Sequence, residues 1–257
     1  MNWREEPKTS RFGSPMIPAV KQLIVFAIGW IGFRVLATTI QVLIIFISRA
    51  NGWNSTEILS RFSTSMILNS VCYISMLVAL TLVINTNILK LIKSFGQWQS
   101  YVAAAICLAS IFAFNIVYGT FINALKELGI INIPVSDNAN EASLQSLQDV
   151  YPVTCLFIFG IIGPICEELT YRVGLFSLLK RKNRFLAYFV TMVVFALIHF
   201  NYSNDPATLL NEVLNLPYYM FAAFAFSFTF DKFGFAASTT AHISNNLVSL
   251  FLVALAR

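Results

Sequence analysis

Long runs of apolar residues constrain the fold of this chain more than any other feature. Most of them are long enough to cross a hydrocarbon core about 30 Å thick as a helix, and none shows the alternation of a strand. Charged residues make up only 11% of the 257 residues, against about 25% in soluble domains. The sequence therefore predicts an all-α, polytopic transmembrane helical bundle. The apolar segments are residues 22–48, 64–85, 101–123, 152–179, 185–200, 207–230 and 233–255.

Two prolines leave the number of helices at seven or eight. Pro164 lies in the fourth segment and Pro217 in the sixth, and each predicts a kink or a break. If the sixth segment consists of two pieces, the bundle has eight helices. We expect residues 1–150 to form three spans with a long outer loop, and residues 151–257 to form a core of four or five helices.

The basic residues are distributed unevenly over the two sides of such a bundle. With the N-terminus inside, eleven Lys and Arg fall on the inner side and four on the outer side, as the positive-inside rule expects. The polar start of the chain, "MNWREEPKTSRFGSP", shows no removable signal pattern. The uneven distribution of basic residues predicts a cytoplasmic N-terminus. The inner group is Arg4, Lys8, Arg11, Lys21, Lys90, Lys93, Lys180, Arg181, Lys182, Arg184 and Lys232; the outer group is Arg49, Arg61, Lys126 and Arg257.

Cysteine usage and charge pattern argue against several classes of function. The four cysteines all lie inside apolar runs without a CxxC pair, which is typical of small buried hydrophobes and not of disulfides or zinc ligands. No basic stretch is interleaved with aromatic residues, so we expect no nucleic-acid partner.

The apolar segments nevertheless contain ionisable side chains. Each one near the bilayer centre costs roughly 2.5–3.5 kcal/mol, so such residues indicate function by default. The chain has only two histidines, and both lie inside apolar segments. The group consists of Arg34, Glu167, Glu168, Arg172, His199, Glu212 and His242, with Asn246 as a neutral companion.

Helix geometry separates the two adjacent glutamates in "ICEELTYR" (residues 165–172). Glu168 and Arg172 are four residues apart, in the order that favours an ion pair. Glu167 is turned away by about 100° and has no local cation, which suits a general base. The alternative is that all three form one buried ion-pair cluster that orders the helix.

Depth along the helices brings the remaining polar residues to one level. Measured from the nearest inner charges, Glu167 lies roughly 20 Å into the bundle, His199 roughly 22 Å, and His242 and Asn246 roughly 15 and 21 Å. Taken singly, His199 is typical of an interfacial residue, and His242 with Asn246 of polar contacts between helices. Their common depth favours a single buried polar site.

The chemistry of these groups suits activated water, because the set lacks an obvious nucleophile. Glu167 would take a proton from water, and His199 would orient the water and pass a proton to the leaving amine. His242 and Asn246 would donate hydrogen bonds to the oxyanion of a tetrahedral intermediate.

Three short motifs resemble those of a known family. "EELTYR", "FALIH" and "HISNN" match, in order, the EExxxR, FxxxH and HxxxN motifs of the CAAX protease and bacteriocin-processing family, also called Abi, whose characterised proteases are intramembrane glutamate endopeptidases. The resemblance covers about 150–255. It implies a mid-membrane site reached from the cytosol, no metal, and the roles given above, with Glu168 and Arg172 as the supporting pair.

The chain departs from that family in small ways. Val173 stands where Gly often follows the motif arginine, and the sixth segment carries small residues where Gly is common. Small residues still allow close helix packing, so these differences concern the shape of the pocket. The small residues of the sixth segment are Ala222, Ala223, Ala225 and Ser227.

The sequence leaves alternatives open for the substrate and for the reaction class. The composition looks bacterial, which favours a short membrane-associated peptide over a prenylated protein as substrate. Glu167, His199 and His242 could instead be zinc ligands. A non-catalytic regulator or immunity scaffold, a transporter and a cysteine protease using Cys166 are further alternatives. Arg34 and Glu212 have no assigned role.

Overall fold

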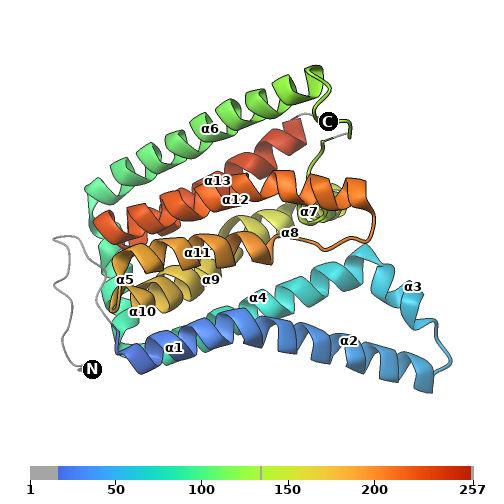
Figure 1. The fold of residues 1–257 in the computed structure, drawn as a ribbon. Coiled ribbons are helices and arrows are strands. Elements are labelled where there is room, and N and C mark those ends of the chain that lie inside the picture. The colour runs from blue at the N-terminus through green and yellow to red at the C-terminus, as the bar shows by residue number, and fades with distance from the viewer. Residues whose placement is uncertain (1–16, 134, 256–257) are drawn as a thin grey trace.

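The computed structural model describes residues 17–133 and 135–255 (Figure 1). These residues contain helices and connecting turns and no strand, so the predicted all-α class is confirmed for this part of the chain. Four of the basic residues used to predict the topology lie outside the described residues, namely Arg4, Lys8, Arg11 and Arg257.

Each apolar segment of the sequence coincides with a helix or a run of continuous helical turns. The sixth is unbroken at Pro217, so the splitting that would have given an eighth helix does not occur. In chain order the helices are α1 (Ala19–Ala27) with α2 (Phe33–Ala50), α4 (Phe62–Ile84), α6 (Trp98–Glu127), α8 (Pro152–Phe157) with α9 (Gly163–Glu167) and α10 (Ser177–Lys180), α11 (Arg184–Ile198), α12 (Pro206–Phe233) and α13 (Phe235–Leu255).

Five helical runs in the described residues are long and apolar enough to cross a membrane, which fits an integral membrane protein. Helix α11 has 15 residues and is too short for this group. Helix α13 is made less apolar by His242, Asn245 and Asn246. The predicted number of seven to eight spans is therefore not confirmed. The five runs are Ala19–Ala50, Phe62–Ile84, Trp98–Glu127, Pro152–Lys180 and Pro206–Phe233.

The run from Pro152 to Lys180 stays helical through Pro164, although its turns widen. Proline has no N–H, so the carbonyl four residues earlier loses its partner. The helix responds with a π-turn at η4 (Ile158–Ile162) and a second π-segment at η5 (Glu168–Phe176). Such wide turns are frequent at functional sites, and here Glu167 and Glu168 stand at the boundary between α9 and η5.

Three shorter helices lie in regions that were predicted as loops. They are α3 (Ser55–Ser60), α5 (Ile88–Lys93) and α7 (Ala139–Val150). Helix α7 lies inside the predicted outer loop, and Asn138 caps it by accepting from the Glu141 N–H. A capping asparagine with an acidic residue three positions later is a helix-start signal that the sequence does contain.

The run from Pro152 to Lys180 occupies the centre of the molecule (Figure 1). Helices α6, α13, α12 and α11 lie on one side of it, and α1, α2 and α4 on the other. Close approach of α1 depends on glycine: a Cβ on Gly174 would lie 3.0 Å from the Phe26 nitrogen, and one on Gly29 would meet Thr170. The contacts Phe26–Gly174 and Gly29–Thr170 also show that α1 runs antiparallel to the central helix.

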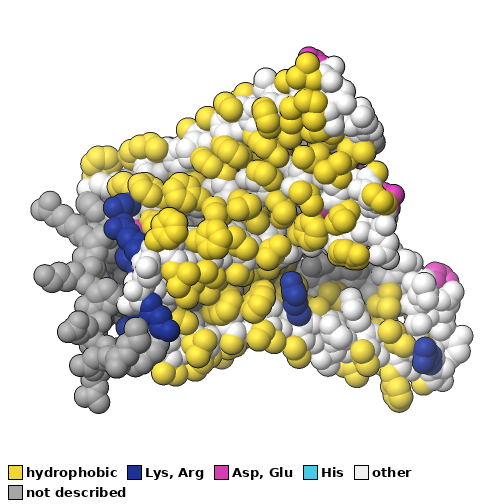
Figure 2. All heavy atoms as spheres, viewed as in Figure 1, with side chains coloured by type: hydrophobic (Ala, Val, Ile, Leu, Met, Phe, Trp, Pro, Cys, Tyr) yellow, Lys and Arg dark blue, Asp and Glu magenta, His cyan; other side chains and the backbone are white. Residues whose placement is uncertain are grey.

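Lys and Arg side chains gather at one end of the molecule (Figure 2). At this basic end, Lys180 and Arg184 both bind the buried Asp231 carboxylate. Arg181 donates to Gln22 Oε1 and to the Ile17 carbonyl, each at 2.9 Å. Helix α7 contacts the opposite end of the central helix, roughly 42 Å from Lys180 at 1.5 Å per residue. This opposite end is called the α7 end below.

Candidate active site

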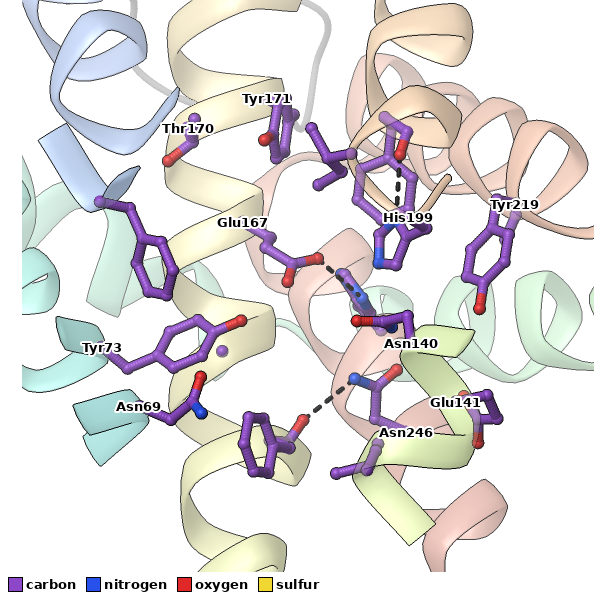
Figure 3. Close-up of a pocket in the computed structure, with 18 of the residues that line it drawn as sticks. Asn69, Tyr73, Asn140, Glu141, Glu167, Thr170, Tyr171, His199, Tyr219 and Asn246 are labelled. Carbon is purple, nitrogen blue, oxygen red and sulfur yellow. Dashed lines mark hydrogen bonds and ion pairs between the residues drawn. The ribbon is translucent and has the colours of Figure 1, made fainter. Parts of the chain in front are cut away.

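One cavity of about 410 Å³ brings together the four residues predicted to be catalytic. Glu167 comes from the end of α9, His199 follows α11, and His242 and Asn246 lie one turn apart on α13. Figure 3 shows the Glu167 carboxylate and the His199 ring pointing into the same space. Residues from α2, α4, α7 and α12 complete the walls, so the cavity is lined from both sides of the predicted boundary at residue 150.

Glu168 and Arg172 form the buried ion pair that helix geometry predicts. Arg172 Nη1 lies 3.1 Å from Glu168 Oε1, and both side chains are fully buried. The guanidinium also lies over the Phe195 ring at 4.8 Å and over the Phe226 ring at 5.4 Å. Ser238 donates to the second oxygen of Glu168. Neither Glu168 nor Arg172 lines the cavity, so the pair braces the helices around the site.

His242 stands between the two glutamates. Its Nδ1 lies 2.9 Å from Glu168 Oε1, and its Nε2 lies 3.7 Å from Glu167 Oε2. The ring is also stacked on Phe226, with centroids 4.4 Å apart. Because a carboxylate can only accept, the Nδ1–H donates to Glu168 and the Nε2 edge faces Glu167 and the cavity. Glu168 thus fixes the orientation of a residue that the sequence left without a partner.

His199 is held by contacts from three elements. Its Nδ1–H donates to the Phe195 carbonyl at 2.9 Å, which leaves Nε2 free to accept from a group in the cavity. Its ring is stacked on Tyr219 of α12, with centroids 4.4 Å apart. Its own carbonyl accepts from Asn138 Nδ2 at 3.0 Å. The ring is therefore fixed in a single orientation.

Asn246 is anchored to the central helix. Its Nδ2 donates to the Phe159 carbonyl at 3.0 Å, within the π-turn of η4 (Figure 3). One of its two amide hydrogens is therefore already engaged, and a single N–H is left for a ligand. The neighbouring Asn245 also lines the cavity.

A row of polar side chains on α12 holds the segment that leads into α7. The Glu212 carboxylate accepts from the Ala139 N–H at 2.8 Å and from the Asn201 N–H at 3.0 Å. Its neighbour in the sequence, Asn211, accepts from the Ser136 N–H at 3.0 Å. Glu212 is buried, with 2% exposure, so these are protected contacts. Glu212, which had no assigned role, thus ties α7 and the loop after His199 to α12.

Several cavity residues precede residue 150 and were missed in the sequence. Tyr73 and Asn69 reach the cavity from α4, Asn140 from α7 and Arg34 from α2. In Figure 3 the Tyr73 hydroxyl and the Asn140 amide point toward the space in front of Glu167. Polar residues at isolated positions carry no motif, and only the charge of Arg34 inside an apolar run gave a signal.

The geometry also bears on two alternative reaction classes. Among residues 17–133 and 135–255, no group of three or more His, Cys, Asp and Glu side chains is arranged so that it could hold a metal ion. His242 already uses Nδ1 on Glu168. Cys166 is fully buried, lies 3.6 Å from the Tyr73 carbonyl oxygen and does not line the cavity. The geometry of the described residues therefore supports neither a zinc site at Glu167, His199 and His242 nor a nucleophilic Cys166.

The rim of the cavity is formed by α7 and by the middle of the helical run from Ala19 to Ala50, where Trp30 and Arg34 are exposed. Its exposed residues include Asn140 and Ser143 of α7 and Arg34 of α2. Burial, together with the nearby charge of Asp137, raises the pKa of the Glu141 carboxyl at this rim. The basic residues gather at the end of the molecule opposite α7. The resemblance implied a site reached from the cytosolic side, and this stays a prediction.

Comparisons with known proteins agree with the three motifs. Residues 149–248 match the family model of the Rce1-like type II CAAX prenyl endopeptidases. An uncharacterized protein of Mycoplasma capricolum subsp. capricolum is 25% identical over 201 residues, which cover 74% of this chain and 55% of that protein. The UPF0177 protein YvdC of Lactococcus lactis subsp. lactis is 31% identical over 61 residues, which cover 24% of this chain and 23% of that protein.

The chain thus spans about half, or less, of the length of these curated relatives. No solved structure matches the chain. The matched region contains Glu167, Glu168, Arg172, His199, His242 and Asn246. The match supports the family predicted from the motifs, and the part of this integral membrane protein that carries them is similar to the Rce1-like type II CAAX prenyl endopeptidases.

Proposed function

We propose that the protein is an intramembrane endopeptidase that hydrolyses a peptide bond of a membrane-associated peptide or protein with water activated by Glu167. The observation that carries the proposal is the division of labour between the two glutamates. Glu168 is fully buried and neutralised by Arg172, whereas Glu167 is 14% exposed and faces the cavity. Glu167 is therefore the carboxylate that is available to water and substrate.

In the proposed reaction, water hydrogen-bonds to Glu167 and to Nε2 of His199. Glu167 takes one proton as the water oxygen bonds to the carbonyl carbon, and the carbonyl electron pair moves to oxygen. His242 with a doubly protonated ring and the remaining N–H of Asn246 donate to that oxyanion. The carbonyl then re-forms, the C–N bond breaks, and His199 relays the proton from Glu167 to the leaving amine. The products are a carboxylic acid and an amine.

The proposal includes the setting of the reaction. A cavity of about 410 Å³ is of a size that accepts a short peptide segment. With the basic end in the cytoplasm, as the positive-inside rule favours, the α7 wall of the cavity lies on the outer side of a bacterial cytoplasmic membrane. A short membrane-associated peptide fits this side, whereas prenylated proteins are held at the cytosolic face. The partners in this proposal are the substrate and membrane lipids, with no nucleic acid.

The test is hydrolysis of a peptide panel, prenylated and plain, by the protein purified in detergent. We expect cleavage by the wild type, unchanged by a chelator, and at least a hundredfold loss in Glu167→Gln, as expected for loss of a general base. Glu127→Gln removes an exposed carboxylate at the end of α6 and serves as the control. Activity that a chelator abolishes and zinc restores would support the metalloprotease instead. Normal function of Glu167→Gln in cells would support the non-catalytic regulator.

A further inference from the structure

Arg34 is a charged side chain in the middle of a membrane-crossing helical run. It is the sixteenth of the 32 residues from Ala19 to Ala50, so either end of the run lies more than roughly 20 Å away. That distance is too long for its side chain to reach the membrane surface. A charge at this depth is costly, and such residues characteristically serve a function.

The side chain of Arg34 makes no ion pair within the described residues, although its charge interacts electrostatically with Tyr171, which also lines the cavity. Arg34 also makes no hydrogen bond with any residue in the described part of the chain, and it is exposed. It lines the cavity that contains Glu167 and His199, and it is the single Lys or Arg among the described residues that do so. The arginine of the EExxxR motif, Arg172, is occupied by Glu168.

Helix packing places Arg34 at the level of the proposed reaction centre. Gly29 packs against Thr170, and the two helices run antiparallel. Arg34 lies five residues beyond Gly29 toward the α7 end, or about 7.5 Å, and Glu167 lies three residues beyond Thr170 in the same direction, or about 4.5 Å. The two residues therefore differ in depth by only about 3 Å, on walls formed by different helices.

We propose that Arg34 binds a carboxylate of the substrate, and that this contact selects peptides with a negative charge close to the cleaved bond. The inference rests on the proposed function. A guanidinium binds carboxylates through paired N–H donors, and a cavity inside the membrane strengthens that contact because little water competes. The carboxylate is either the C-terminus of the peptide or an Asp or Glu side chain, since the two have the same chemistry.

The test uses a library of apolar decapeptides in matched forms. Each peptide is made with a C-terminal carboxylate or carboxamide, and with Asp or Asn at its centre. Cleavage is measured as kcat/KM for the wild type, Arg34→Gln and Arg34→Lys, and binding to each is measured by fluorescence anisotropy in the Glu167→Gln background. Arg49→Gln removes a charge from the last turn of the same helix, outside the cavity, and is the control.

We expect neutralisation of the recognised carboxylate to lower kcat/KM and affinity at least about tenfold in proteins that keep Arg34. Arg34→Gln should treat the charged and neutral peptides alike, and Arg34→Lys should retain part of the preference. The form of peptide that loses activity, amide or Asn, identifies the source of the carboxylate. Equal treatment of all forms by the wild type would overturn the inference.

Two outcomes separate this inference from the proposed function. Charge-selective binding that depends on Arg34, without any cleavage, would support the inference and overturn the endopeptidase. Cleavage without charge selectivity would support the endopeptidase and overturn the inference about Arg34. An effect of Arg34→Gln that is the same for all peptides, and that appears only in nanodiscs with phosphatidylglycerol and not in lipid-free detergent, would assign Arg34 to a lipid phosphate and overturn the inference.

Discussion

Removing Arg172 should destabilise the protein far more than removing the matching cation of an exposed pair. Glu168–Arg172 and Glu57–Arg61 are both Glu–Arg pairs four residues apart on a helix, with N–O distances of 3.1 and 2.8 Å. The first pair is fully buried, and the second is about 60% exposed. The two pairs therefore isolate the effect of burial at nearly constant geometry.

The expected magnitude follows from what Glu168 keeps when Arg172 is lost. Removing one partner of a buried pair costs about 3–5 kcal/mol, because a charge stays buried without compensation. His242 and Ser238 still donate to Glu168, so we expect Arg172→Met to fall near the lower end, about 3 kcal/mol. The exposed control Arg61→Met should cost about 0.5 kcal/mol or less.

The four buried cysteines provide the assay. A thiol-reactive dye reports unfolding in detergent when these cysteines become accessible. At about 2–4 °C per kcal/mol for a chain of this size, Arg172→Met should lower Tm by about 6–12 °C and Arg61→Met by at most about 2 °C. Adding Glu168→Gln to Arg172→Met should recover part of the loss. Equal shifts in Arg172→Met and Arg61→Met, or no recovery in the double variant, would refute the reasoning.

Four further predictions concern the α7 end, the packing of α1 and the orientation in the membrane. Glu212→Ala leaves the Ala139 and Asn201 N–H groups without their charged acceptor and should cost about 1–3 kcal/mol in the same melting assay; an unchanged Tm would contradict the role given to α12. Gly174→Val should cost about 1–3 kcal/mol, because the new side chain meets the α1 backbone, which melting would also show. The raised pKa of Glu141 means that the folded state is penalised once that carboxyl ionises, so Glu141→Gln should melt above the wild type at pH 7 and equal to it at pH 4. In intact cells an impermeant thiol reagent should label Ser143→Cys and not Lys93→Cys, and the reverse pattern would refute the proposed orientation.

The site could be predicted from the sequence to the extent that its parts are local. Spacing along one helix was sufficient for the Glu168–Arg172 pair, because residues four apart share a face in any helix. Depth along the apolar segments brought Glu167, His199 and His242 to one level, since the rise per residue is fixed. These arguments require no knowledge of how the helices pack.

Contacts between distant segments could not be predicted in this way. That His242 lies between Glu168 and Glu167 depends on how α13 packs against the central helix. Arg34 and Tyr73 belong to helices without a recognisable motif and reach the cavity only through the packing of α2 and α4. One alternative from the sequence, a sixth segment split at Pro217, was also wrong. Helix α12 is continuous through this proline, because neighbouring helices can compensate for a missing hydrogen bond.

The sequence by itself thus determined the all-helical membrane class and the identity of the polar residues that need an explanation, and its motifs indicated a family that the family-model match supports. Hydrophobicity and helix periodicity are properties of short segments, and they act before any tertiary contact forms. The tertiary structure decided which polar residues share a cavity, which glutamate is neutralised, and that α7 forms part of the cavity wall. These features depend on helix crossings such as Gly29–Thr170, where the absence of one side chain allows two backbones to approach.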